Sequence, residues 1–200
     1  MWPIIIHKDE GSERAYDLPS RLLLDRIIIL NEPINSDSAM SIISQLLYLE
    51  SLDSKKKITM YINSPGGVIT DGLAIYDIMR TITCPIETVC VGIAASMGAF
   101  LLSAGRKGMR YAMPNSSIMI HQPLGGAEGQ ASDIEIASKR ISYLKDKLYT
   151  IMSENTNYTK KQMEKACERD NYLTPIEALK IGLIDKIIEP SLEKGGEINE

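Results

Sequence analysis

The sequence predicts a single α/β domain organised around a parallel β-sheet. Runs of apolar and β-branched residues at 27–30, 58–62 and 86–91 have the composition of buried strands. Segments with helical periodicity separate these runs, which is the alternation of a parallel sheet with right-handed helical crossovers. The chain has 200 residues, the length of one domain with a sizeable core. Ligands bind at the carboxyl ends of the strands in such sheets, so a functional site is expected there.

The composition excludes several classes of protein. A net charge of −4 provides no electrostatic basis for binding nucleic acid or an anionic membrane. The three cysteines, Cys84, Cys90 and Cys167, form no C-x-x-C pair, so we expect no disulfide framework, no metal site and a reducing compartment. The uncharged stretch at 88–105 divides into strand, turn and helix, so no membrane span is expected. Without a signal-peptide core, the protein is expected to stay in the cytoplasm.

The N-terminal half contains an arm, a helix and the first strand–turn–helix unit. Residues 1–19 mix an isoleucine triplet with charges and are expected to form a mobile arm outside the core. Polar residues at 35–38 offer an N-cap for a helix that continues to Glu50. Its apolar side chains on one face are Met40, Ile43 and Leu47. The strand at 58–62 ends in the turn signal Asn63-Ser64-Pro65-Gly66-Gly67, before a helix over about 70–82.

Shorter elements are expected after residue 105. Strands are predicted at 110–113 and 118–120, and the second strand delivers His121. Capping boxes predict two further helices, which begin after Thr159 and Thr174. Asp170 falls in the connection between these two helices. The polar stretch at 191–200 is expected to be a flexible tail.

The longest periodic segment runs from Ala131 to Glu154. Its apolar residues alternate spacings of three and four, which is the narrow seam of a helix that packs on another helix. They are Ile134, Ala137, Ile141, Leu144, Leu148 and Ile151. The pattern fits a helix lying on its own domain, and it equally fits a helix that protrudes to meet a partner subunit.

A hydroxyl group lies where the strand beginning at 86 gives way to a helix. Small residues flank Ser96, so the backbone can turn sharply there and present the side chain. The amide of Met97 then points the same way and can donate to a developing oxyanion. The pattern Ala94-Ala95-Ser96-Met97-Gly98 departs from the G-x-S-x-G elbow. Small residues around a serine also mark a closely packed helix, so this motif leaves both interpretations open.

A serine nucleophile needs a base, and the chain has only two histidines. His7 lies in the charged arm, whereas His121 lies at a strand end near Ser96 in the predicted sheet. Any Ser/His pair is therefore Ser96 with His121, although a turn histidine before Pro123 is the alternative. With 26 acidic residues present, spacing cannot select the third member. Gly66-Gly67 is either a second oxyanion donor or an ordinary type II turn.

Four motifs occur in a characteristic order. They are YINSPGG at 61–67, AASMGA at 94–99, MIHQP at 119–123 and ERDNY at 168–172. Together they resemble the ClpP family, the proteolytic subunits of the Clp protease, and the resemblance covers about residues 11–189. It implies a ClpP/crotonase-like fold, in which β-β-α units repeat as a superhelix. It also implies an axial-pore arm at 1–19, a head domain at 20–190 and a protruding handle helix at about 131–154.

The resemblance implies a serine endopeptidase with a Ser-His-Asp triad. Ser96 matches the nucleophile, His121 the general base and Asp170 the orienting carboxylate. The backbone amides of Gly67 and Met97 match the oxyanion hole. Gly125 and Gly126 match the segment that would bind the substrate main chain. Arg169 matches a residue that would link ring contact to activation. Tyr61 matches a residue that would help to dock the unfoldase.

The resemblance also implies partners. Two seven-membered rings of this chain would stack through the handle helix around a chamber, where unfolded proteins are cut to short peptides for quality control and regulated proteolysis. The chain has no G-x-x-x-x-G-K-[ST] motif, so an AAA+ unfoldase of the ClpX, ClpC or ClpA type would supply the substrates. No cofactor is expected. The alternatives are a crotonase-type acyl-CoA enzyme and an inactive ring-forming paralogue.

Overall fold

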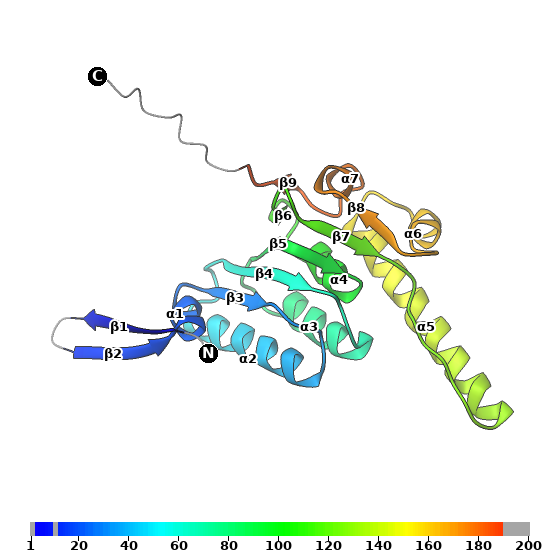
Figure 1. Ribbon diagram of the computed structural model, residues 1–200, viewed down its shortest axis with the longest axis horizontal. Coiled ribbons are helices and arrows are strands. Elements are labelled where there is room, and N and C mark those ends of the chain that lie inside the picture. Colours follow the sequence, from blue (N-terminus) through cyan, green and yellow to red (C-terminus); the bar gives the residue numbers. More distant parts are fainter. Residues whose placement is uncertain (1–2, 10–11, 190–200) are drawn as a thin grey trace, which may run out of the picture.

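The computed structural model describes residues 3–9 and 12–189, and it has a mixed α/β fold with a mostly parallel sheet (Figure 1). The main strands are hydrogen-bonded in the order β3 (Ile27–Leu30), β4 (Ile58–Ser64), β5 (Ile86–Ala95), β6 (Arg110–Ala112) and β9 (Lys186–Ile187). The end of β5 also pairs in parallel with β7 (Ser117–Ile120), and β8 (Asn171–Leu173) pairs antiparallel with β7. The predicted fold class is confirmed.

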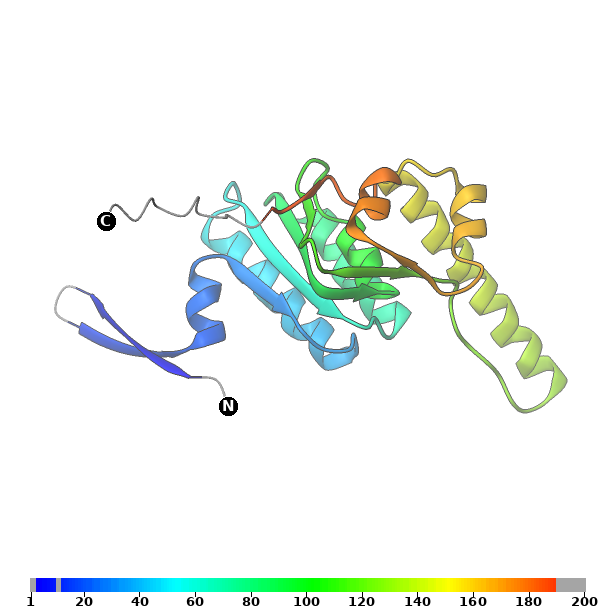
Figure 2. The same ribbon diagram turned by 45° about the horizontal axis from the view of Figure 1, so that its top comes forward.

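Seven helices surround the sheet in the described part of the chain. They are α1 (Leu18–Leu24), α2 (Ser36–Leu52), α3 (Ile69–Thr81), α4 (Met97–Ser103), α5 (Ala131–Asn155), α6 (Lys160–Ala166) and α7 (Pro175–Lys180). Figure 2 shows α2, α3 and α4 behind the sheet, with the other face of the sheet toward the viewer. Alternate residues of β4, namely Ile58, Met60 and Ile62, are fully buried in the core. Both predicted capping boxes, at Thr159 and Thr174, are confirmed.

The apolar face predicted for the first long helix is not the face that packs on the sheet. The buried hydrophobic residues of α2 are Ala39, Ile42, Leu46 and Leu49, whereas Met40 is 63% and Leu47 is 47% exposed. The helix carries two apolar rows one residue apart, and periodicity alone does not say which row faces the core. Of the predicted row, Ile43 is partly buried against the core, whereas Met40 and Leu47 are left on the surface of the single chain.

The N-terminal region is more regular than its composition suggested. Strands β1 (Ile4–Asp9) and β2 (Ser12–Asp17) form an antiparallel hairpin, and Asp17 caps α1. The hairpin stands at one end of the molecule (Figure 1), and Ile4 and Ile6 are 73% and 62% exposed. Residues 1–2 and the predicted flexible tail at 191–200 lie outside the described residues.

Helix α5 belongs to the core only in its second half. Its buried residues are Leu148, Tyr149, Ile151 and Met152. The first half projects from the body of the molecule (Figures 1 and 2), and Ile134 and Ile136 are 44% and 66% exposed there. Each of the two sequence interpretations therefore applies to one half of the helix: one half lies on its own domain and the other protrudes.

Arg110 is a buried charge that joins three parts of the fold. Its side chain is 3% exposed, and its Nε and Nη2 donate to the Asp185 carboxylate at 2.8 and 2.6 Å. Its Nη1 donates to the carbonyl oxygens of Ser103 and Asn155, at the ends of α4 and α5. The bidentate pair thus ties the segment before β9 to β6, and the bond from Nη1 to Asn155 O ties the C-terminal end of α5 to the same strand.

Replacing Asp185 with asparagine is expected to lower the free energy of unfolding by about 3 kcal/mol at neutral pH, because the buried guanidinium of Arg110 loses its counter-charge. The matched control is Asp25→Asn. That carboxylate is 54% exposed in a pair with Arg21, and such surface pairs contribute at most about 1 kcal/mol. Urea denaturation of the three proteins at equal chain concentration measures the difference.

The effect of Asp185→Asn is expected to depend on pH. Burial raises the pKa of Asp185, but hydrogen bonds and charge from Arg110, together with the amides of Arg110 and Gly108, bring the pKa below its ordinary value of 3.8. The carboxylate therefore stabilises the fold above the pKa of the unfolded chain, and this contribution is lost as the pH falls through the lowered pKa. A difference between the two proteins that stayed constant from pH 7 to below pH 3 would contradict the ion-pair explanation.

Candidate active site

Three adjacent strands bring the predicted triad residues to one edge of the sheet. Ser96 follows β5, His121 follows β7, and Asp170 immediately precedes β8. The pairing of Ala95 with Met119 places the ends of β5 and β7 side by side. Because β8 runs antiparallel to β7, its first residue lies opposite the last residue of β7. The three side chains therefore meet although they are far apart in the sequence.

The three side chains form a continuous chain of hydrogen bonds. His121 Nε2 lies 2.8 Å from Ser96 Oγ, and His121 Nδ1 lies 2.9 Å from Asp170 Oδ1. With Nδ1–H donated to the carboxylate, Nε2 is the acceptor for the serine hydroxyl proton. The His121 side chain is 12% exposed and that of Asp170 is 60% exposed. The imidazole is thus held on both sides inside a partly enclosed site.

Ser96 occupies a strained backbone position. Its φ is 53° and its ψ is −118°, a region that residues other than glycine rarely adopt. The Ser96 N–H donates to Met119 O at 2.8 Å, and Phe100 N–H donates to Ser96 O at 3.0 Å. Strand β7 and the first turn of α4 hold this conformation. The sharp turn between strand and helix that the small residues predicted is present.

Two backbone amides belong to residues that line the cavity beside the serine hydroxyl. Met97 is the first residue of α4, and the first N–H groups of a helix have no acceptor within the helix. In the glycine turn, Ile34 N–H donates to Gly66 O and Val68 N–H donates to Ile34 O, both at 2.8 Å. These bonds leave the Gly67 amide unused within the described residues. Both amides are therefore available to an oxygen atom at Ser96.

Replacing Gly67 with alanine tests the predicted oxyanion donor: kcat/KM for a peptide substrate is expected to fall about 10²- to 10³-fold, the loss of one such donor. A Cβ at this position would lie 2.0 Å from the carbonyl oxygen of Ile34, so the turn must move and the amide is misdirected. Gly108→Ala is the matched control, because it also has a positive φ, of 88°, but its Cβ would meet no atom within 4 Å. Equal losses in both variants would mean that backbone strain alone, without the misplaced amide, explains the effect.

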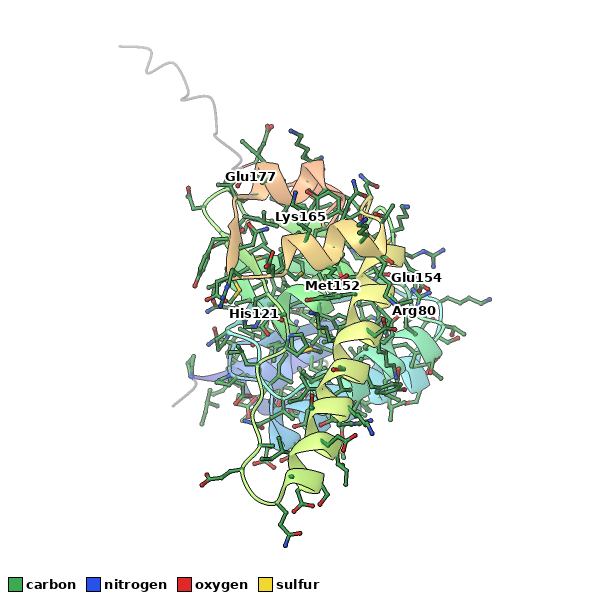
Figure 3. All side chains as sticks on the ribbon, turned by 90° about the vertical axis from the view of Figure 1, so that its right-hand side faces the viewer. Arg80, His121, Met152, Glu154, Lys165 and Glu177 are labelled. Atoms are coloured by element: carbon green, nitrogen blue, oxygen red, sulfur yellow. The ribbon has the colours of Figure 1, made fainter. Side chains whose placement is uncertain are left out.

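A cavity of about 240 Å³ opens beside the hydroxyl, and we call it the Ser96 cavity. Gly67, Ser96, Met97 and His121 are among the residues that line it. Its apolar wall includes Pro65, Ile69, Phe100, Leu124, Leu148 and Met152. Figure 3 labels His121 and Met152, which border this cavity from β7 and α5 respectively. A pocket that is mostly apolar, with a few polar groups, suits one side chain of a polypeptide.

The other predicted residues lie around this site or apart from it. Gly125 and Gly126 follow β7 in an extended segment whose backbone pairs with no strand in the described chain. Arg169 is exposed and lies with Asp170 in a neighbouring cavity of about 350 Å³. Tyr61 lies away from the triad, on β4, where it borders a separate cavity of about 440 Å³.

Sequence reasoning missed two features of the site. Gln122 Nε2 donates to Glu168 O at 2.9 Å, which ties the segment after His121 to the segment that carries Asp170. Helix α5 supplies Leu148, Tyr149 and Met152 to the cavity wall. The periodic seam at 131–154 marked Leu148 as apolar, but no signal in the sequence indicated that the helix borders the serine.

The described residues give no support for a metal site, a membrane-spanning helix or a reactive cysteine. No group of three or more histidine, cysteine or acidic side chains there could hold a metal ion. In that same part of the chain, every helix is too short or too polar to cross a membrane. Burial raises the pKa of the Cys90 thiol to about 11 and that of the Cys167 thiol to about 12, so both stay protonated at neutral pH.

The fold and the hydrogen-bonded serine, histidine and aspartate have the geometry of a serine hydrolase. A family model described as Clp protease matches residues 10–191. The chain therefore belongs to the Clp protease family and is a serine peptidase of the ClpP type. This family also implies, in general terms, an oligomeric assembly and an unfoldase partner.

Proposed function

We propose that the chain is a serine endopeptidase in which Ser96 is the nucleophile, His121 the general base and Asp170 the carboxylate that orients the imidazole. The observation that carries this proposal is the unbroken set of hydrogen bonds from Ser96 Oγ through His121 to Asp170 Oδ1. The unused amides of Gly67 and Met97 support an oxyanion hole beside the hydroxyl.

The chemistry follows from this arrangement. Ser96 Oγ attacks the carbonyl carbon of the scissile peptide while its proton passes to His121 Nε2. The carbonyl oxygen becomes an anion and accepts hydrogen bonds from the Gly67 and Met97 amides. Imidazolium then gives its proton to the leaving nitrogen, and the C–N bond breaks to leave an acyl-enzyme. Water, deprotonated by the same imidazole, releases the acid and restores Ser96.

The extended segment at Gly125 and Gly126 is proposed to pair with the main chain of the substrate. Its backbone groups are not used by any strand of the described chain, and glycine lets another backbone approach closely. Gly125 also lies against α5, because a Cβ there would come within 2.7 Å of Ile141 Cδ1. A peptide bound in this way would run along α5 near Ile141, with one side chain in the Ser96 cavity.

The assembly proposed is two stacked seven-membered rings of this chain enclosing the active sites. The projecting half of α5, with exposed Ile134, Ile136 and Tyr143, supports a contact between copies across the stack. Arg169 is proposed to link that contact to the triad through its neighbour Asp170. Tyr61, at a cavity on the face of β4 that points away from the core, is proposed to help to receive an AAA+ unfoldase of the ClpX, ClpC or ClpA type. Unfolded proteins in the cytoplasm would be the substrates.

Labelling with a fluorophosphonate probe, followed by peptide mapping and native mass spectrometry, tests the proposal. We expect one covalent adduct per chain, at Ser96, on the assembled rings. A crotonase-type acyl-CoA enzyme would not react at Ser96, and an inactive ring subunit would assemble without labelling. Either result would overturn the peptidase assignment for this chain.

A further inference from the structure

Ser64, the last residue of β4, carries a fully buried hydroxyl that the proposed chemistry does not use. Its Oγ donates to the carbonyl oxygen of Glu32 at 2.7 Å and accepts the N–H of Gly66 at 3.2 Å. The hydroxyl proton and a lone pair are therefore both engaged. Removing this oxygen would take a partner from a carbonyl and an amide at once, so the hydroxyl holds the chain around it in one arrangement.

The bond to Ser64 fixes one end of the residue that directs the Gly67 amide. Ile34 N–H donates to the carbonyl oxygen of Gly66 at 2.8 Å, while the N–H of Gly66 is held by Ser64 Oγ. The Gly66 carbonyl and the Gly67 N–H belong to one planar peptide group, so the direction of the first sets the direction of the second. Gly66 has a φ of 92°, and glycine adopts other backbone conformations equally well. The turn therefore keeps this direction because other groups hold it.

Ser64 also packs against the first turn of α4, next to the Met97 amide. A Cβ at Gly98 would lie 2.9 Å from Ser64 O, so the backbone of α4 comes as close to Ser64 as glycine permits. In the glycine turn, a Cβ at Gly66 would lie 2.7 Å from Ser96 Cβ and 3.0 Å from Met97 N. The turn and the start of α4 are thus in close contact, and Ser64 contacts both. A shift of the turn would change the spacing of the two amides beside the Ser96 hydroxyl.

We propose that Ser64 is a positioning residue for the oxyanion site: its hydroxyl holds Gly66, and through Gly66 it aims the Gly67 amide at the oxygen that becomes negative. Ser64 is fully buried and lies outside the lining of the Ser96 cavity, so it acts without touching the substrate. Its effect falls on the transition state, in which the oxyanion forms, and hardly on the binding of the intact peptide. This inference rests on the proposed peptidase function.

Ser64→Ala removes the hydroxyl and is the first variant to measure. We expect kcat for a fluorogenic peptide to fall about 10- to 100-fold, less than the loss of a whole oxyanion donor, while KM changes by less than about threefold. The matched control is Thr156→Val, at the C-terminal end of α5. Thr156 Oγ1 is also buried, donates to Met152 O at 2.8 Å and accepts the N–H of Tyr158 at 3.3 Å. Thr156→Val should lower the melting temperature as Ser64→Ala does, but it should keep kcat.

The double variant, Ser64→Ala with Gly67→Ala, separates positioning from general damage. If the hydroxyl acts through the Gly67 amide, Gly67→Ala has already lost what Ser64 positions, so kcat of the double variant should stay within about threefold of Gly67→Ala alone. Independent structural effects would instead multiply the two losses. Multiplied losses, or a kcat of Ser64→Ala within about twofold of the unchanged protein, would overturn the proposal.

Ser64→Cys takes the place of Ser64→Ala in both measurements if the alanine variant fails to assemble. A thiol is a weak donor and a weak acceptor, so it holds Gly66 less firmly while filling the buried site. We expect kcat to fall at least about threefold in Ser64→Cys, the loss of part of a neutral hydrogen bond, and the losses again to be non-additive with Gly67→Ala. An unchanged kcat in this variant would also overturn the role of Ser64.

The failure of this inference is distinguishable from failure of the peptidase assignment. If the fluorophosphonate labels Ser96 and Gly67→Ala loses activity as expected, but the Ser64 variants keep theirs, only the role of Ser64 is wrong. If Ser96 is neither labelled nor needed for cleavage, the peptidase assignment fails and the role of Ser64 fails with it.

Discussion

Replacing Ser96 with alanine is expected to lower kcat/KM for a fluorogenic peptide by about 10⁴- to 10⁶-fold, the loss found when the nucleophile of a triad is removed. The cause is chemical, because alanine has no oxygen to attack the carbonyl carbon. The amides of Gly67 and Met97, the proposed oxyanion donors, remain, so a small residual acceleration over water is expected. The strained backbone at position 96 is kept by the bonds to Met119 and Phe100, so the fold should survive.

The measurement needs an exposed serine as its control. Ser54 lies on the surface after α2, and its carbonyl, which Ser54→Ala leaves intact, accepts a hydrogen bond from Thr83 Oγ1. Ser54→Ala should therefore keep full activity, and Ser96→Ala should keep the native mass and melting temperature of the assembly. Cleavage by Ser96→Ala at a rate within tenfold of the unchanged protein would show that another group is the nucleophile.

The proposed nucleophile and base each have a local signal in the sequence. Ser96 lies among small residues between a strand-like run and a helix-like run, and the structure has a strand end and a helix start at those places. His121 was reached by elimination, since His7 is the only other histidine. The arrangement of three strands then brings the two side chains together.

No local sequence pattern identifies Asp170 as the third residue of the triad. Its position beside His121 depends on the antiparallel pairing of β7 with β8, and β8 has only three residues. A strand this short shows no period, so its register cannot be predicted from the pattern of its side chains. Among the 26 acidic residues, only the family resemblance selects Asp170.

The wall of the Ser96 cavity is the other part that local patterns could not supply. The seam of α5 predicted an apolar face but not its neighbours, because periodicity describes one helix and not the element that it meets. The same limit explains α2, where two apolar rows compete and the row containing Ile42 and Leu46 faces the core. Which face is buried depends on contacts between elements distant in the sequence.

Replacing Asp170 with asparagine is expected to lower kcat by about 10³- to 10⁴-fold while leaving the hydroxyl and the imidazole in place. The carboxylate accepts the Nδ1–H of His121 at 2.9 Å, which keeps Nε2 as the acceptor for the Ser96 proton. An asparagine amide can instead donate to Nδ1. The ring then carries its proton on Nε2 and cannot take the proton of the serine hydroxyl.

Because the Asp170 side chain is exposed, Asp170→Asn should affect catalysis without destabilising the fold. The Asp170 side chain is 60% exposed, so removal of its charge should change the free energy of unfolding by less than about 1 kcal/mol. Asp77→Asn on the exposed side of α3 is the matched control and should keep full activity. Fluorophosphonate labelling of Ser96 should slow in parallel with kcat, because both reactions need the same proton transfer. If Asp170→Asn cleaved peptides at the normal rate, the imidazole would be oriented by some other group, and the hydrogen bond to Asp170 would have no part in the chemistry.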